Sequence, residues 1–305
     1  MGRERESMNE SQRILALTIA RLPGLKPHEK VRLCKRFADN PSEFFSAGFL
    51  EVEFLIGRPS SKPWNIARLQ EQAEHDALLA KKRGVSFVSC LEPEYPPQLL
   101  EIFAPPPVLF YRGKLSDPTL PHVAIVGTRK PTGAGVSTAF NLAREFGGLG
   151  FPVVSGLALG IDAIAHKGCV EGGGATFAVL GSSPDEVYPK TNRILAQRIL
   201  QTGGGILSEY PPETKPNAWQ FPARNRLISG LARGVLIIEA PEKSGALITA
   251  RFAMEQNRDL FVARSSLDSP CGMGCVKLVE DGVKAVSSAE DILWEWGWSS
   301  STGEG

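Results

Sequence analysis

The chain has 305 residues, enough for a sizeable hydrophobic core and for two domains, and its apolar fraction of 42% is ordinary for a globular protein. A net charge of +1 excludes a histone-like polycation, and no segment approaches the ~20 consecutive apolar residues of a membrane span. The polar N-terminus lacks the apolar core of a secretory signal, and five scattered cysteines make no disulfide framework, which together indicate a reducing cytoplasm.

The first part of the chain is expected to be helical, because apolar residues recur at helical spacing over 14–19, 31–37 and 44–54. We predict a helical N-terminal domain, similar to SAM or helix-hairpin-helix modules, over 1–83, a main domain over 84–296 and a disordered tail over 297–305. The segment Arg21–Leu25 resembles the turn with which helix-hairpin-helix modules contact DNA phosphates. A plain turn between two helices is the favoured interpretation.

After residue 84, short apolar strands alternate with helical patterns. The expected strands are Val85–Ser89, Val108–Tyr111, Val123–Val126, Val153–Ser155, Thr176–Leu180, Gly205–Ser208, Val235–Glu239 and Asp259–Ala263. The expected helices are Glu94–Ile102, Gly133–Gly147, Ile161–Val170, Asn192–Gln201, Asn225–Ala232, Gly245–Gln256 and Ser288–Glu295. This order predicts an α/β fold with an extended, Rossmann-like, doubly wound and mostly parallel sheet, which binds ligands at the carboxyl ends of its strands.

The loop after the strand Val123–Val126 is the first candidate site. The loop combines small residues with cations, and it precedes the N-terminus of a helix. Its residues are Gly127, Thr128, Arg129 and Lys130, and this combination suits binding of a phosphate group. It matches neither the GxxxxGK[ST] nor the GxGxxG fingerprint, which disfavours a P-loop NTPase and a classical NAD site. The structural alternative is a surface pair of cations that caps the edge of the sheet.

The loop after the second strand of the alternating region is also rich in small residues. Ser155, Gly156 and Gly160 would let a phosphate backbone approach closely. Asp162 is predicted to cap the following helix, and His166, one turn further on, to be a buried histidine rather than a general base.

Polar residues downstream extend the candidate site. Lys190 and Asn192 offer donors without an acid–base partner, and Ser244 could bind a phosphate or cap its helix. Arg224, Asn225 and Arg226 are expected at a helix start, where the arginines would meet either phosphates or buried carboxylates such as Glu209 and Glu239. The segment 190–233 carries seven Lys and Arg against two Glu, which counts toward binding only if it lies beside the glycine-rich loops.

Several blocks together resemble the DNA-processing protein family called DprA or Smf, from Val123 to about Val286, with a weaker echo over Ser11–Tyr111. They are VGTR (126–129), SGLALGID (155–162), GGATFAVLG (173–181), YPKTN (188–192), SEYP (208–211), FPARNRLISGL (221–231), IIEA (237–240) and SGALITA (244–250). Eight blocks in this order are highly specific.

The resemblance implies a cytoplasmic protein that binds and protects single-stranded DNA, loads the recombinase RecA in natural transformation or recombination, and forms homodimers through its Rossmann domain. It implies no catalytic residue, cofactor or metal, and a phosphate pocket that includes Arg129, Ser155, Gly156, Lys190 and Asn192. The chain departs from the family at Ala134, where a Tyr is usual, at 263–266, where a Val-Pro-Gly turn is usual, and at Val276, where an Asn is usual.

The alternative is an enzyme of the lysine-decarboxylase-like (LOG) group, which releases bases from nucleotides and shares the Rossmann plan. That group carries a catalytic Glu in a PGGxGTxxE motif. Here Arg251 falls near the position of that acid, which disfavours the activity and leaves Glu239 and Glu255 as the remaining candidates.

Overall fold

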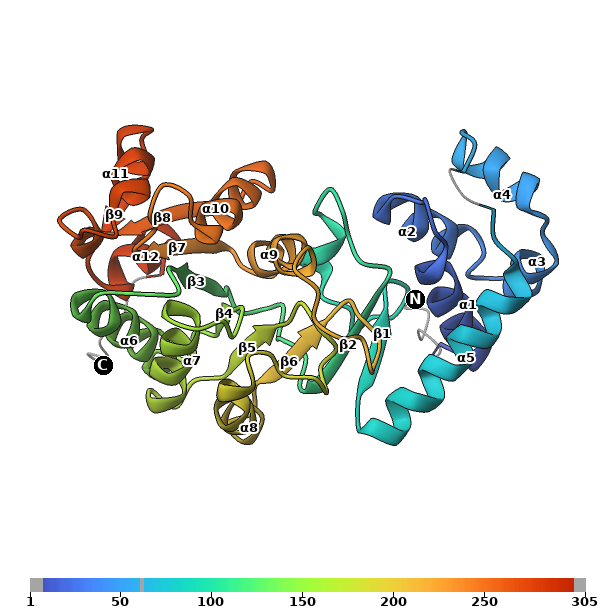
Figure 1. Cartoon of the computed structure of the whole chain (residues 1–305), viewed down its shortest axis with the longest axis horizontal. Helices are drawn as coiled ribbons and strands as arrows, with labels where there is room; N and C mark the ends of the chain where they lie inside the picture. Colours follow the sequence, from blue (N-terminus) through green and yellow to red (C-terminus); the bar gives the residue numbers. More distant parts are fainter. Residues whose placement is uncertain (1–7, 61–62, 299–305) are drawn as a thin grey trace, which may run out of the picture.

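The computed structural model describes residues 8–60 and 63–298, which form a nine-stranded sheet with helices on both faces and a helical unit at one end (Figure 1). The strands lie in the order β1-β2-β6-β5-β4-β3-β7-β8-β9. The pairs β1–β2 and β2–β6 are antiparallel and all other pairs are parallel. The strands are β1 (Ser86–Ser89), β2 (Val108–Gly113), β3 (Val123–Gly127), β4 (Val153–Ser155), β5 (Thr176–Val179), β6 (Gly205–Ser208), β7 (Gly234–Ile238), β8 (Asp259–Ala263) and β9 (Lys284–Val286).

The helical unit consists of the first five helices, and the others alternate with the strands. The helices are α1 (Glu10–Arg21), α2 (Pro27–Arg36), α3 (Pro41–Ser46), α4 (Phe49–Ile56), α5 (Ile66–Arg83), α6 (Gly133–Gly148), α7 (Ile161–Glu171), α8 (Arg193–Gln201), α9 (Gln220–Gly230), α10 (Gly245–Glu255), α11 (Met273–Glu280) and α12 (Ala289–Glu295). Short 3-10 turns are η1 (Pro97–Leu100), η2 (Lys190–Asn192) and η3 (Arg264–Ser266). No described helix is long and apolar enough to cross a membrane.

The central strand β3 shows why the sheet is covered on both faces. Its side chains alternate: Val123 and Ile125 pack into the cluster formed with α6, α7 and α12, whereas Ala124 and Val126 pack into the cluster that contains α9 and α10 residues. A strand buried on both faces has to be continuously apolar, as VAIV is. The predicted doubly wound sheet is therefore confirmed.

The topology fixes where a ligand would bind. From β3 the chain winds outward through β4, β5 and β6, and then returns to place β7 on the other side of β3. The loops that follow β3 and β7 therefore begin next to each other at one edge of the sheet. One loop leads to α6 on one face, and the other leads to α10 on the opposite face. Such a topological switch point opens a crevice at the carboxyl ends of the strands.

The helical unit shares its core with the sheet. Leu15 and Leu33 of the unit belong to the same buried cluster as Val88 of β1 and Leu109 of β2. The predicted domain boundary at residue 83 stays a prediction. Of the predicted disordered tail, Trp298 packs edge-on against Phe151 at 5.1 Å between ring centroids, and 299–305 lie outside the described residues.

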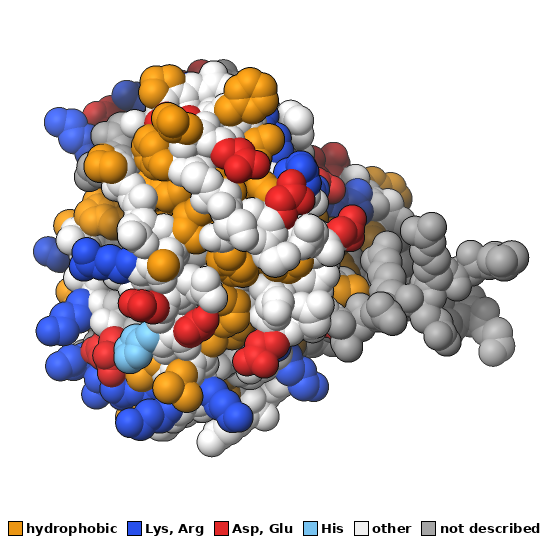
Figure 2. All heavy atoms as spheres, turned by 90° about the vertical axis from the view of Figure 1, so that its right-hand side faces the viewer, with side chains coloured by type: hydrophobic (Ala, Val, Ile, Leu, Met, Phe, Trp, Pro, Cys, Tyr) orange, Lys and Arg blue, Asp and Glu red, His pale blue; other side chains and the backbone are white. Residues whose placement is uncertain are grey.

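The turn that resembles a helix-hairpin-helix module is held by internal contacts. Arg58 donates to the carbonyl oxygen of Gly24 at 3.0 Å, and Arg21 forms an ion pair with Asp76 at 2.6 Å. On the face shown in Figure 2, Lys and Arg side chains gather along the left and lower edges, with acidic and apolar side chains between and above them. The internal contacts favour the plain helix–helix turn.

Two helix predictions need correction. The helix expected over Glu94–Ile102 is only the 3-10 turn η1, because Pro96 and Pro97 lack the N–H groups that an α-helix uses. Helix α9 begins at Gln220 rather than Asn225, since Pro222 falls in its first turn, where no intrahelical N–H bond is lost. Helix α11 and strand β9 were not expected, and both are short.

Candidate functional site

A groove of about 800 Å³ opens at the switch point between β3 and β7. It is bordered by the loops that follow these two strands, by the first turns of α9 and by the N-terminal half of α10. Its lining residues are Val126, Gly127, Thr128, Arg129, Lys130, Ala158, Asp162, Tyr188, Ala218, Phe221, Pro222, Arg224, Asn225, Ile228, Pro241, Lys243, Ser244, Gly245, Ala246, Ile248, Thr249 and Cys271.

The first loop is held close to its neighbours. A Cβ on Gly127 would lie 1.9 Å from the carbonyl oxygen of Ile238, so only glycine fits there. The next residue, Thr128, donates its N–H to the carbonyl oxygen of Glu239 at 2.8 Å. Gly160, with φ of +78°, packs its Cα against the backbone of Thr128 and Arg129. These contacts fix the loop while Arg129 and Lys130 remain exposed at the groove.

The buried carboxylate of Glu239 fixes the same loop from below. It is 1% exposed and accepts hydrogen bonds from the N–H and hydroxyl of Thr132 and, at 2.6 Å, from the hydroxyl of Ser269. A Cβ on Gly135 would lie 2.3 Å from Glu239 Oε2, so this glycine makes room for the carboxylate. Glu239 therefore joins the start of α6 to the segment after β8, and it does not line the groove.

Arg224 lies on the floor of the groove and is held there by the backbone. It is 4% exposed, and its guanidinium donates to the carbonyl oxygens of Gly156, at 2.8 Å, and of Val179. Asp162 lies against the same glycine and accepts its N–H at 3.1 Å. Burial lowers the pKa of Arg224 to about 10, and burial raises the pKa of Asp162. Arg224 therefore holds the second loop, and its contact with phosphate stays a prediction.

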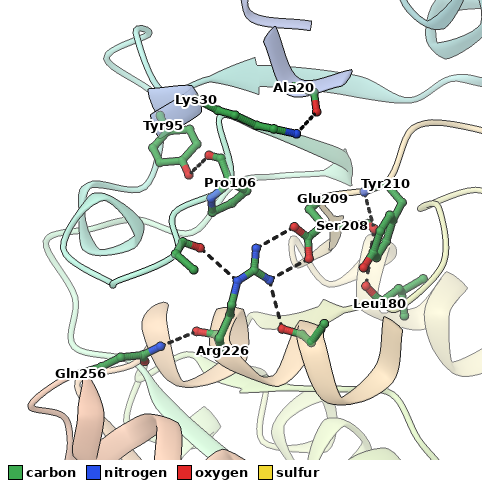
Figure 3. A network of polar contacts seen from close by, with 12 residues as sticks. Ala20, Lys30, Tyr95, Pro106, Leu180, Ser208, Glu209, Tyr210, Arg226 and Gln256 are labelled. Carbon is green, nitrogen blue, oxygen red and sulfur yellow. Dashed lines mark hydrogen bonds and ion pairs between the residues drawn. The ribbon is translucent and has the colours of Figure 1, made fainter. Parts of the chain in front are cut away.

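Arg226 points away from the groove, toward the helical unit (Figure 3). Its guanidinium forms two hydrogen bonds with Glu209, at 2.7 and 2.6 Å, and two with the carbonyl oxygens of Ala104 and Ala223, both at 3.0 Å. Of the two alternatives open for this arginine, the buried carboxylate is the correct one. Arg226 is therefore removed from the candidate interface.

Ser155 and Asn192 are also structural. The buried Ser155 hydroxyl donates to the carbonyl oxygen of Ile125 at 2.7 Å. The Asn192 amide donates to the carbonyl oxygens of Leu157, at 2.9 Å, and Ala158. Both expectations of direct contact are corrected, because these groups hold the loop between β4 and α7 in place.

Three other predicted residues stay available at the surface. Lys190 is exposed on η2, next to the turn that Asn192 anchors. Asn225 lines the groove and donates to the carbonyl oxygen of Gly245 at 3.3 Å. Ser244 caps α10, where its hydroxyl accepts the N–H of Ala246 at 3.2 Å, and it borders the groove as well.

The basic segment 190–233 is mostly neutralised within the protein. Arg193, Arg198 and Arg226 form ion pairs with Glu186, Glu171 and Glu209. Arg233 lies over the ring of Trp296 at 5.1 Å. The exposed cations of the groove come from elsewhere, namely Arg129 and Lys130 after β3 and Lys243 after β7.

Lys243 and two aromatic residues were missed in the sequence. Tyr188, 49% exposed, and Phe221 line the groove with ring centroids 5.5 Å apart. Their position in the blocks YPKTN and FPARNR was the available signal. The signal for Lys243 was weaker: it is a cation that follows a strand and directly precedes Ser244, the N-cap of the next helix.

The groove does not bring together an acid–base pair. Asp162 accepts from Gly156, while His166 is buried and bonds through Nδ1 to the Thr176 hydroxyl at 2.7 Å, so the two do not act on each other. Arg251 and Glu255 pair at 3.3 Å on the exposed side of α10, outside the groove lining. Among the described residues, no group of three His, Cys, Asp or Glu side chains could hold a metal ion.

Comparison with known proteins gives the family. The model of the family described as DNA recombination-mediator protein A matches residues 86–297. The chain is 43% identical over 250 residues to the Smf protein of Synechocystis, which covers 81% of this chain and 60% of the relative. The chain thus spans less than two thirds of that relative's length.

Two solved structures are similar along most of their length. The DNA processing protein A of Streptococcus pneumoniae superimposes with a TM-score of 0.77 and 34% identity, covering 94% of this chain and 98% of that one. The protein from Helicobacter pylori, described for its single-stranded DNA binding mode, gives a TM-score of 0.60 and 32% identity, covering 70% of this chain and 95% of that one. The chain belongs to the DNA recombination-mediator protein A family, the DNA-processing proteins also called DprA or Smf.

Proposed function

We propose that this protein binds single-stranded DNA in the groove at the switch point, with the phosphates on Arg129, Lys130 and Lys243. The observation that carries the proposal is the charge of the groove wall. These three cations are exposed on two adjacent loops, and the one acidic lining residue, Asp162, is buried and bound to Gly156. A polyanion needs cations and N–H donors at intervals, not a nucleophile.

The aromatic residues support a single strand over a duplex. Tyr188 and Phe221 lie together at the groove, where unpaired bases could stack on them. Each stacked base contributes about 1–3 kcal/mol, and the bases of a duplex are not accessible to such stacking. The relative from Helicobacter pylori, for which single-stranded DNA binding is described, supports the same assignment.

Four residues are proposed to position the interface. Arg224, Glu239, Ser155 and Asn192 hold the loops whose exposed members meet the strand. Lys190, Asn225, Ser244, Gly127 and Thr128 complete the proposed surface, either as donors or as points of close backbone approach. Gly156 and Gly160, which were predicted to contact DNA, instead pack against Arg224, Asp162 and the loop after β3 and do not line the groove.

The wider role follows the family. We propose that the protein processes incoming DNA in transformation or recombination in the cytoplasm, loads RecA onto the bound strand and forms homodimers through the sheet domain. A pull-down with the cognate recombinase and light scattering after size exclusion test these two contacts separately. Absence of the RecA contact would restrict the role to DNA binding, and a monomer in solution would overturn the proposed homodimer.

The experiment for the main proposal measures binding of fluorescent oligo-dT by anisotropy to the wild type and to the Arg129→Ala and Lys243→Ala variants. We expect weaker binding by both variants. Unchanged affinity in both would remove the groove from DNA binding.

We further propose that the protein is not an enzyme. The carboxylate oxygens of Glu239 accept hydrogen bonds from Thr132 and Ser269, and Glu255 forms an ion pair with Arg251 away from the groove. Neither carboxylate is therefore placed to act on a nucleotide. Incubation with nucleoside monophosphates and detection of free base tests this directly. Sustained turnover would favour the phosphoribohydrolase alternative.

A further inference from the structure

A second pocket, here called the junction pocket, lies where the helical unit meets the sheet. It has a volume of about 430 Å³. Helices α1, α2 and α5 form one wall, and β2, the segment after β6 and α9 form the other. Its lining residues are Leu17, Ala20, Arg21, Pro27, Lys30, Asp76, Phe110, Glu209, Tyr210, Pro211, Trp219, Ala223 and Arg226.

The junction pocket has three cations, Arg21, Lys30 and Arg226, and two carboxylates, Asp76 and Glu209. Asp76 is bound by Arg21 through two contacts of 2.6 Å, and Glu209 is bound by Arg226 through both oxygens. No carboxylate of the described residues lies within ion-pair distance of Lys30, whose ammonium donates to the carbonyl oxygen of Ala20 at 2.6 Å (Figure 3). Burial lowers the pKa of Lys30 to about 8, so it is still mostly charged at neutral pH.

A half-buried cation whose attraction to Glu209 is shared with Arg226 favours an anionic ligand, because partial burial of a charge is costly. Lys30 has further N–H donors beyond the one that Ala20 accepts. A single phosphate group would supply the missing charge.

The opposite wall of the junction pocket is aromatic. Trp219 is 60% exposed and stands edge-on to Tyr210, with ring centroids 6.0 Å apart. An indole ring that lines a pocket offers a flat face on which a nucleobase can stack. A nucleotide carries both groups, a phosphate and a base, on one sugar.

The junction pocket is adjacent to the groove through one short segment. Ala218, Phe221 and Pro222 line the groove, whereas their neighbours Trp219 and Ala223 line the junction pocket. The start of α9 therefore borders both the groove and the junction pocket.

We propose that the junction pocket takes one nucleotide of the same single strand that lies in the groove, with its phosphate on Lys30 and its base against Trp219 and Tyr210. This inference rests on the proposed function and extends the DNA path onto the helical unit. The helical unit then contributes to affinity for long strands only.

The test compares short oligo-dT of about six nucleotides with long oligo-dT of about twenty, the short one being at the low end of typical site sizes. The variants are Lys30→Gln and Trp219→Ala, with Arg129→Ala for the groove and Arg198→Ala as a matched exposed arginine. We expect Trp219→Ala and Lys30→Gln to weaken long-strand binding about fivefold or more and to leave short-strand binding unchanged. Long oligonucleotides carrying 5-iodouracil should cross-link to Trp219 or Tyr210.

The outcomes separate this inference from the proposed function. If the two junction variants bind long strands like the wild type while Arg129→Ala is weakened, the junction pocket is overturned and the groove stands. If Arg129→Ala is also unaffected, the groove assignment fails with it. Equal losses on both lengths would also contradict the inference. Because Trp219 is largely exposed, its variant keeps the test valid should Lys30→Gln fail to fold.

Discussion

Arg224 donates a hydrogen bond from its buried guanidinium to the carbonyl oxygen of Gly156 at 2.8 Å, across 68 residues of sequence. A Cβ on Gly156 would lie 2.6 Å from both the Arg224 guanidinium and the Asp162 carboxylate. The buried arginine thus shapes the loop that borders the groove, while Arg129 stays exposed at the groove.

Replacement of Arg224 is expected to cost stability. In Arg224→Ala, the carbonyl oxygens of Gly156 and Val179 lose their donor and Asp162 loses the positive charge beside it, so the free energy of unfolding falls by about 3 kcal/mol or more. Urea unfolding followed by circular dichroism measures this. A variant as stable as the wild type would mean that the buried contacts contribute nothing.

Replacement of Arg129 is expected to weaken DNA binding and to leave stability unchanged. Arg129 is exposed, so Arg129→Ala should keep the wild-type unfolding midpoint but bind oligo-dT about tenfold more weakly, the equivalent of one charge-assisted hydrogen bond of about 1.5 kcal/mol. The slope of log affinity against log salt should fall by about 0.7. Arg198→Ala, an exposed arginine paired with Glu171, is the control and should match the wild type in both measurements. Equal loss in both variants would indicate a general charge effect rather than a groove.

Glu239 and Gly135 are expected to be coupled. Glu239→Ala leaves the donors of Thr132 and Ser269 without their acceptor and should cost about 2–4 kcal/mol of unfolding free energy. Gly135→Ala places a methyl group against the same carboxylate and should also destabilise. Because both changes disturb one contact, the double variant should lose less than the sum of the single losses. Strict additivity in urea unfolding would contradict the coupling.

The protein is expected to become less stable in mild acid. Burial lowers the pKa of His166 to about 3 and of His122 to about 4, while both would return to about 6.5 in the unfolded chain. The unfolded state therefore binds more protons, and stability that is complete above pH 6.5 is lost as the pH falls toward the folded values. With two such histidines, the free energy of unfolding should fall by about 2–3 kcal/mol per pH unit between about pH 5.5 and pH 4.

Urea midpoints between pH 7.5 and pH 4 measure that slope. His166→Gln should reduce it to about half, since one of the two histidines then no longer titrates. His75→Gln, at an exposed position of α5, is the matched control and should leave the slope unchanged. A wild-type slope in His166→Gln would show that other groups control the acid sensitivity.

Much of the fold could be predicted because the patterns that indicate strands and helices lie within short stretches of sequence. The alternation of short apolar strands with helices, and the continuous apolar run of β3, follow from burial on both faces of a parallel sheet. Helix α11 and strand β9 gave too little periodicity in eight and three residues to be recognised.

The site was predictable only at the level of loops. Arg224 and Arg226 are two positions apart, and on a helix that begins at Gln220 they point in nearly opposite directions, one under the groove and one toward Glu209. The sequence predicted a helix that begins at Asn225, which left Arg224 outside the helix, so the different directions of the two arginines could not be predicted. The direction of a side chain depends on the helix register, and a charge count over 190–233 carries no such information.

The most direct test of DNA binding in the groove is a competition experiment. Unlabelled single strand and duplex of the same sequence compete for the protein against labelled oligo-dT, at low and at moderate salt. We expect the single strand to displace the label at much lower concentration than the duplex, and binding to weaken steeply with salt. Equal displacement by both, or binding that is insensitive to salt, would contradict a cationic groove that holds the backbone of a single strand.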